Sequence, residues 1–173
     1  YFAEPLQVKL AKSPLRRIIL PSDTCRYEIN LEDAFESSEE LKEVKNLDKL
    51  YFITNLNSTF HRCRKLISVT LPDTSMRIDS LSGTFFWCDS LKKVNNFDKI
   101  ENIRYMSYTF NGCESLESIS FSTQMDSSVY LNDYTFCDCE KLMDIKNLDH
   151  VKISYVGYKI FKNCHKLSAL QLN

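Results

Sequence analysis

The chain has 173 residues, and its 22 Lys and Arg against 23 Asp and Glu leave a formal net charge of −1. This balance gives no electrostatic reason to expect nucleic acid or an anionic membrane as the main partner, and no apolar run approaches the roughly 20 residues of a membrane helix. Only three glycines are present and alanine is scarce, which argues against hairpin-rich β folds and helical bundles.

Residues 1–14 follow no clear pattern, and we expect them to form a degenerate cap at the N-terminal end of the fold. The chain starts with Tyr1, and no basic stretch followed by an apolar one marks a signal peptide. A first recognisable motif, Leu15-Arg-Arg-Ile18-Ile-Leu20, then opens a segment that repeats to residue 173. The sequence therefore predicts one repeat domain over residues 15–173.

The repeat is anchored by phenylalanine in the pattern F-x-x-C-x-x-L-x-x-[VIL]. A copy beginning at Phe35 has Ser38 in place of the cysteine, and five further copies carry Cys. The phenylalanines step by 25, 25, 25, 26 and 25 residues, at Phe35, Phe60, Phe85, Phe110, Phe136 and Phe161. A fixed period of this length indicates stacked coils, each too small to bury its apolar side alone.

Copies alternate in the residues after this motif. One kind continues as Val69-Thr-Leu71-Pro, and the other as Val44-Lys-Asn-Leu47-Asp-Lys, a form that returns near Val94 and Ile145. The underlying unit is therefore predicted to span about 50 residues, or two coils. Asn and Asp at the turns are expected to tolerate left-handed backbone in place of the missing glycines.

A period near 25 with a central Leu-x-x-Val-x-Leu, as in Leu66, Val69 and Leu71, is typical of a leucine-rich-repeat solenoid. We expect a right-handed solenoid of the α/β repeat class, mostly β, with about six to seven coils. Parallel strands should line one face, because Val69 and Leu71 point to the same side of an extended segment. The return segments should be irregular or form short helices.

The copies resemble the BspA-like class of leucine-rich repeats, which read roughly A-F-x-x-C-x-x-L-x-x-I-x-I-P. The segment from Phe60 to Pro72 fits this pattern, and the alternate copies, such as Asn96 to Leu116, resemble a related bacterial surface-protein repeat. The resemblance covers nearly the whole chain. It implies a secreted or cell-surface location and a role in adhesion or in binding a host or protein ligand.

Two cysteines one residue apart, Cys137 and Cys139, raise the question of a metal or redox site. Alignment of the copies separates them, because only Cys139 occupies the repeat position. We expect Cys137 to face outward or into a turn as a candidate reactive thiol, and Cys25 also lies off the repeat position. The repeat cysteines should form a buried ladder of free thiols, since stacked Cβ atoms lie too far apart for disulfides: Cys63, Cys88, Cys113, Cys139 and Cys164.

Nothing in the sequence singles out a catalytic residue, a cofactor site or a metal site. His61, His150 and His165 lack metal-ligand spacing and are expected at exposed positions, and no phosphate-binding loop or nucleophile motif is present. We therefore predict a non-enzymatic protein, with a thiol-based metal or redox protein as the remote alternative.

Two surfaces are candidate partner sites. The exposed strand positions carry a lysine bias on alternate coils, at Lys42, Lys45, Lys92, Lys93 and Lys146. Phe86 and Trp87 fall where other copies have polar residues, so we expect them to be at least partly exposed, or else to cover the neighbouring coil. Tyr51 and Phe52 are a weaker case of the same kind.

The chain stops at Asn173 directly after a strand motif, without a polar cap. Because solenoids need capped ends and an open sheet edge invites pairing, we expect a longer parent protein or self-association through this edge. The function predicted from the sequence is a protein-binding or adhesion module. The main alternative is a structural spacer that holds another domain away from a surface.

Overall fold

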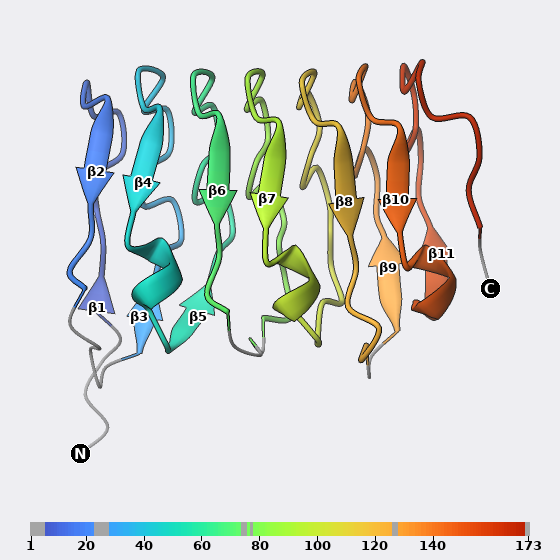
Figure 1. Cartoon of the computed structure of the whole chain (residues 1–173), viewed down its shortest axis with the longest axis horizontal. Helices are drawn as coiled ribbons and strands as arrows, with labels where there is room; N and C mark the ends of the chain where they lie inside the picture. The colour runs from blue at the N-terminus through green and yellow to red at the C-terminus, as the bar shows by residue number, and fades with distance from the viewer. Residues whose placement is uncertain (1–5, 23–27, 74–75, 77, 126–127, 172–173) are drawn as a thin grey trace.

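The computed structural model describes residues 6–22, 28–73, 76, 78–125 and 128–171. Short parallel strands and tight turns build about six turns of a β-solenoid, which runs from β1 and β2 at one end to β10 and β11 at the other (Figure 1). The predicted leucine-rich-repeat solenoid is therefore confirmed.

The front row of strands has one strand for each coil, at the predicted Leu-x-x-Val motif. The row comprises β2 (Arg17–Ile19), β4 (Glu43–Lys45), β6 (Ser68–Thr70), β7 (Lys93–Asn95), β8 (Ser118–Ser120) and β10 (Asp144–Lys146). The strands pair two by two in parallel: β2 with β4, β6 with β7, and β8 with β10. Backbone hydrogen bonds also join one pair to the next, such as the bond from Glu117 N–H to Lys92 O at 3.2 Å. The middle residue of each strand turns toward the core, and Val69 and Ile119 are buried there.

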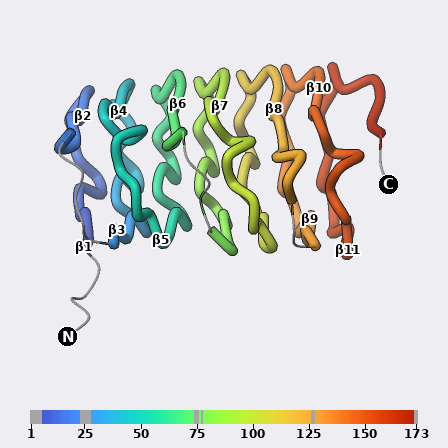
Figure 2. Tube along the Cα trace, turned by 60° about the horizontal axis from the view of Figure 1, so that its bottom comes forward, coloured from blue at the N-terminus to red at the C-terminus, as the bar shows by residue number. Residues whose placement is uncertain are grey.

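A second row of parallel strands lies on the return side, where irregular or helical segments were expected from the sequence (Figure 2). Return residues of successive coils also stack at strand spacing, so their backbones can pair wherever they are extended. The row comprises β1 (Leu6–Gln7), β3 (Ile29–Asn30), β5 (Ile53–Asn55), the bridges Ser80–Tyr105–Tyr130, β9 (Val129–Leu131) and β11 (Ile153–Val156).

The predicted two-coil alternation is visible as short 3₁₀ helices on every second coil: η1 (Leu47–Lys49), η2 (Phe97–Lys99) and η3 (Leu148–His150). An asparagine at φ near 60° precedes each helix. Its side-chain Nδ2 donates to a backbone carbonyl of the preceding coil, as from Asn96 to Leu71 at 2.9 Å. These asparagines thus start the helix and tie two coils together.

Left-handed backbone also occurs two residues before and two residues after each anchor phenylalanine. The expectation that Asn and Asp would hold the left-handed turns is wrong for several of these positions, since Arg62, Trp87 and Tyr108 adopt φ values of 59°, 57° and 55°. Stacking requires the same backbone path in each coil, so these bulky side chains accept a conformation that costs energy for a residue with a Cβ.

The core consists of ladders in which equivalent side chains stack from coil to coil. The anchor rings from Phe35 to Phe161 stack with centroid separations of 5.4, 5.6, 5.4, 5.4 and 5.7 Å. A threonine ladder, which was not predicted from the sequence, lies one residue before the rings. The Oγ1 of Thr84, for example, lies 2.9 Å from the Leu56 carbonyl of the preceding coil, and Thr59, Thr109 and Thr135 repeat this bond.

At the C-terminal end, the motif at Leu167 to Leu170 forms no strand, so β10 is the last strand of the front row within the described residues. Leu167 and Leu170 are half-buried, whereas their counterparts Leu142 and Ile145 are buried. The sequence end itself, residues 172–173, lies outside the described part of the chain. Self-association through this end stays a prediction.

Candidate functional site

The five repeat cysteines form the predicted ladder of free thiols. Each Sγ–H donates to the carbonyl oxygen of the anchor phenylalanine in the preceding coil, at 3.2, 3.0, 3.1, 3.1 and 3.0 Å for Cys63, Cys88, Cys113, Cys139 and Cys164. Ser38 makes the corresponding bond to Leu10 at 3.1 Å. Each of these phenylalanine carbonyls also accepts a backbone N–H within its own coil, as Phe60 O does from Cys63 N at 2.9 Å. The thiols thus add a second hydrogen bond that ties each coil to the next and leaves the buried S–H group with a partner.

Cys164 is half-buried, and a hydrogen bond with Cys139 lowers its pKa. Burial keeps the other four thiols of the ladder protonated. It raises the pKa of Cys63 to about 12, and it raises the pKa values of Cys88, Cys113 and Cys139 well above that of an ordinary thiol. Because the thiolate is the species that attacks disulfides and binds metals, this environment favours a structural role. Within the described ranges, no group of three or more His, Cys, Asp or Glu side chains is placed to hold a metal ion.

Cys137 was expected to face outward or into a turn, as a candidate reactive thiol. It lies in a turn, but its side chain is only 2% exposed, and its Sγ lies 3.1 Å from Asp138 Oδ2. Burial and the neighbouring Asp138 carboxylate raise the pKa of Cys137 to about 12. The neighbouring coils cover this position, so the prediction of a reactive thiol is wrong. Cys25 lies outside the described residues.

The candidate lysines of the front row are all exposed, on one face of the solenoid. They do not form one cluster. Lys42 and Lys92 occupy equivalent positions two coils apart, with Ile67 of the intervening coil between them, so their backbones are separated by about 10 Å at strand spacing. The ammonium group of Lys45 lies 3.8 Å from a Glu43 carboxylate oxygen. Of these five lysines only Lys92 and Lys93 are adjacent, while Lys146 lies in β10, the last strand of the row that the structure describes.

Phe86 and Trp87 are half-buried, so the expectation of partial exposure is met. They also cover the preceding coil. Phe86 stacks on His61 with ring centroids 4.9 Å apart, and the guanidinium carbons of Arg62 and Arg64 lie 4.7 and 5.6 Å from the Trp87 ring centroid. Much of their surface is therefore already in contact with this protein.

His61 is not the exposed histidine that the sequence suggested. It is half-buried between Glu36 and Phe86, and its Nδ1 lies 3.3 Å from a Glu36 carboxylate oxygen. Its Nε2 is covered and has no hydrogen-bond partner within the described part of the chain. Burial lowers the pKa of His61, although the Glu36 carboxylate opposes this effect. The neutral ring is thus favoured as a stacking partner of Phe86.

From Phe86, a line of ring contacts continues along the solenoid into more exposed tyrosines. Phe86 contacts Tyr108 at 5.5 Å between centroids, Tyr108 stacks on Tyr134 at 5.1 Å, and Tyr134 meets Tyr158 edge-on at 5.8 Å. Tyr108 and Tyr158 are exposed. We call this surface the aromatic ridge: His61, Phe86, Trp87, Tyr108, Tyr134 and Tyr158.

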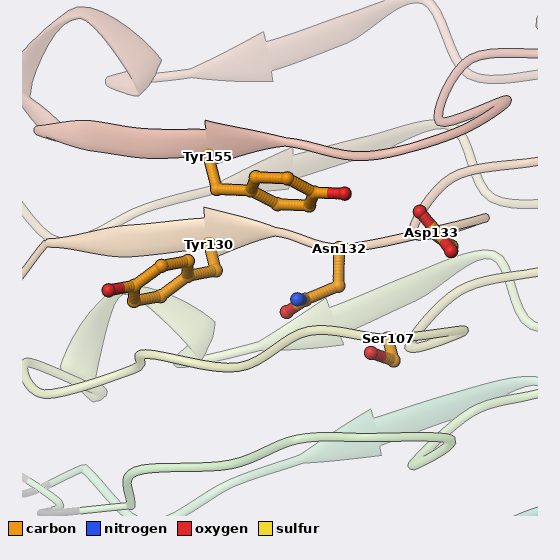
Figure 3. A pocket seen from close by; sticks show the side chains of 5 residues that line it. All are labelled: Ser107, Tyr130, Asn132, Asp133 and Tyr155. Carbon is orange, nitrogen blue, oxygen red and sulfur yellow. The ribbon is translucent and has the colours of Figure 1, made fainter.

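A second tyrosine row lies on the return strands. Tyr105 stacks on Tyr130 at 5.5 Å, and Tyr130 lies 6.4 Å from Tyr155. A pocket of about 320 Å³ is lined by Tyr130 and Tyr155 together with Ser107, Asn132 and Asp133 (Figure 3). Neither tyrosine set was predicted from the sequence, although the 25-residue spacing of Tyr105, Tyr130 and Tyr155 could have revealed this row.

Gly112 provides a direct test of how the ridge is packed. It adopts φ +74°, and a Cβ added there would lie 2.4 Å from Trp87 Cδ1. We expect Gly112→Ala to lower the free energy of unfolding by about 1–3 kcal/mol, from left-handed strain and displacement of the indole. Because Trp87 is the only tryptophan, its emission should shift in the folded variant.

The control is Gly112→Ala in a Trp87→Ala background. Removal of the indole leaves only the backbone term, so the double-mutant cycle should show a coupling of at least about 0.5 kcal/mol. Additive losses from the two substitutions would contradict the close packing of Trp87 on Gly112.

Strands paired in parallel from coil to coil, with a leucine-centred core and a polar outer face, define a leucine-rich-repeat solenoid. A family model described as "BspA type Leucine rich repeat region (6 copies)" matches residues 54–173 of this chain. The chain therefore belongs to the BspA-type leucine-rich-repeat family, as the sequence resemblance indicated.

A solved structure of the same architecture agrees on the fold. A leucine-rich-repeat protein of T. pallidum superposes with a TM-score of 0.62 at 19% identity, over 93% of this chain and 81% of that one. A leucine-rich-repeat protein from Bacteroides ovatus ATCC 8483 has a TM-score of 0.43 and 20% sequence identity, and the match covers 90% of this chain and 48% of that protein. No curated protein matches. Within the described residues, no helix has the length and apolar character needed to cross a membrane.

Proposed function

We propose that the chain is a non-catalytic protein-binding module whose partner docks on the aromatic ridge. The observation that carries this proposal is the unbroken line of ring contacts from Trp87 to Tyr158, in which Tyr108 and Tyr158 are exposed. Trp, Tyr and Arg dominate the energetics of protein interfaces. Arg62 and Arg64 lie beside Trp87, so the ridge combines all three.

Packing within the ridge supports the same proposal. A tyrosine offers a large contact area but loses few rotatable bonds when it is fixed. Tyr108 and Tyr134 already stack with an interplanar angle of 11°, so a partner would order little that is not ordered beforehand. Pre-organised side chains of this kind lower the entropic cost of association.

The family supports binding rather than catalysis as the general role. Leucine-rich repeats display variable residues on a rigid, repeated backbone, which suits recognition of large partners. Adhesion to a host or protein ligand, and a secreted or cell-surface location, remain proposals from the family resemblance. The lysines of the front row form the competing footprint, and a structural spacer is the competing function.

The proposal is tested by comparing two surface variants. Tyr108→Ser with Tyr158→Ser removes exposed rings from the ridge, and Lys92→Glu with Lys93→Glu alters the front row. On arrays of purified proteins, wild type and the lysine variant should bind a common set of partners. The ridge variant should bind those partners at least about tenfold more weakly, as expected when hot-spot residues worth over 1 kcal/mol are lost.

Matching thermal unfolding curves would show that both variants remain folded. Loss of binding in the lysine variant alone would place the footprint on the front row and overturn the ridge. If neither variant changed the bound set, or if the array showed no specific partner, the spacer function would be favoured.

A further inference from the structure

The pocket beside the ridge combines two aromatic walls with a polar floor. Tyr155 extends along β11 toward Asp133, while the Asn132 side chain extends from the end of β9 toward Ser107 (Figure 3). Tyr155 is 49% exposed, and the other four lining residues are half-buried. The volume of about 320 Å³ lies at the lower end of the range for small-molecule sites, about 300–1,000 Å³. The pocket therefore suits a ligand the size of one ring.

Hydrogen bonds within the protein fix the floor of the pocket and leave specific atoms available. Asn132 Oδ1 accepts the Met106 backbone N–H at 3.0 Å, and Asp133 Oδ1 accepts the Tyr158 backbone N–H at 2.6 Å. Among the described residues, no hydrogen bond engages Asn132 Nδ2, Asp133 Oδ2 or Ser107 Oγ. The pocket thus offers an amide donor, a carboxylate acceptor and a hydroxyl that can do either.

We propose that this pocket binds a single saccharide ring. A sugar presents hydroxyls that both donate and accept, which matches the amide, carboxylate and hydroxyl of Asn132, Asp133 and Ser107. It also presents patches of C–H groups with partial positive charge, which are attracted to the negative face of an aromatic ring, and Tyr130 and Tyr155 supply such rings. This binding goes beyond the proposed protein docking, because the pocket and the aromatic ridge share no residue.

A lysine or arginine side chain is the competing occupant, since Asp133 and the tyrosine rings could attract a cation. The Asn132 amide distinguishes the two ligands. A cationic group can only donate hydrogen bonds, so it leaves the Nδ2 donor without a partner. A sugar hydroxyl can accept from Nδ2 and donate to Asp133 Oδ2 at the same time.

The test uses saturation-transfer NMR and titration with named free sugars: glucose, galactose, mannose, N-acetylglucosamine and lactose. Binding of at least one sugar is expected with a dissociation constant of about 0.1–10 mM, since a small polar ligand buries little surface. Saturation should be strongest at the C–H protons that contact Tyr130 and Tyr155. The trilysine peptide serves as the cationic probe.

Two variants locate the site. Tyr130→Ala should weaken sugar binding by about tenfold or more, whereas Tyr105→Ala should not, because Tyr105 stacks on Tyr130 but does not line the pocket. Asn132→Asp keeps an oxygen for the Met106 N–H but replaces the Nδ2 donor with an acceptor beside Asp133. It should weaken sugar binding by about tenfold while the protein stays folded.

Several outcomes would overturn the saccharide proposal. These are no sugar binding by the wild type, equal losses in Tyr105→Ala and Tyr130→Ala, or unchanged binding in Asn132→Asp. Trilysine binding that strengthens in Asn132→Asp, in the absence of sugar binding, would identify the pocket as a cation site instead. None of these results depends on whether the aromatic ridge binds a protein.

Discussion

Replacement of Phe110 by alanine is expected to lower the free energy of unfolding by about 3–5 kcal/mol, as for other fully buried phenylalanines. Phe110 is 0% exposed, and its ring stacks on both Phe85 and Phe136 at 5.4 Å and contacts Phe97 at 5.5 Å. The cavity would lie in mid-solenoid, where coils on both sides are held in place by their other neighbours. Urea denaturation followed by circular dichroism measures the loss.

Phe161→Ala is the matched control, because Phe161 occupies the same repeat position in the last coil. It is half-buried, and among the residues that the structure describes its ring stacks on Phe136 alone, at 5.7 Å. A smaller loss of about 1–2 kcal/mol is expected, since less apolar surface is removed from contact. Equal losses at the two positions would contradict a core whose stability depends on stacking from both sides.

Alkaline pH should destabilise the protein through its buried thiols. Burial raises the pKa of Cys63 to about 12, whereas an unfolded thiol has a pKa of about 8.5. Below pH 8.5 both states hold the proton, so the contribution of Cys63 to stability is complete. As the pH rises from about 8.5 toward 12, Cys63 ionises in the unfolded state but stays protonated in the folded state. The free energy of unfolding therefore falls by about 1.4 kcal/mol per pH unit from this group.

Cys63→Ser isolates this effect. Serine does not titrate in this range, and Ser38 already fills the same repeat position, where its hydroxyl donates to Leu10 O at 3.1 Å. Between pH 8 and 10.5, under reducing conditions, wild type should lose about 2–3 kcal/mol more than the variant. Parallel stability curves for the two proteins would show that Cys63 is accessible to ionisation in the native state.

The candidate site was only partly predictable from the sequence. Phe86 and Trp87 stood out because sister copies carry polar residues there, and the structure places both in the aromatic ridge. Tyr108 and Tyr134 were missed although both stand two residues before an anchor phenylalanine, because the same position carries Asp33, Ser58 and Gly83 in the earlier coils. Their contact depends on how variable side chains orient on adjacent coils, which a repeat alignment does not specify. Cys137 was expected to face outward or into a turn, and its burial was missed because the side chains that cover it belong to variable positions.

The sequence by itself determined the coil, its period, the alternation marked by Asn46, Asn96 and Asn147, and the buried ladder of cysteines. In a solenoid the neighbours of a repeat position are the same position about 25 residues away, so periodicity alone assigns these contacts.

Only the tertiary structure decided where the variable residues meet. Pairing of the return strands brings Tyr130, Asn132 and Tyr155 round one pocket, and the stacked coils bury Cys137. Tyr130 and Tyr155 repeat at a 25-residue spacing, but the polar positions beside them and the position of Cys137 are not filled alike from coil to coil. Their contacts depend on the particular side chains packed above and below them.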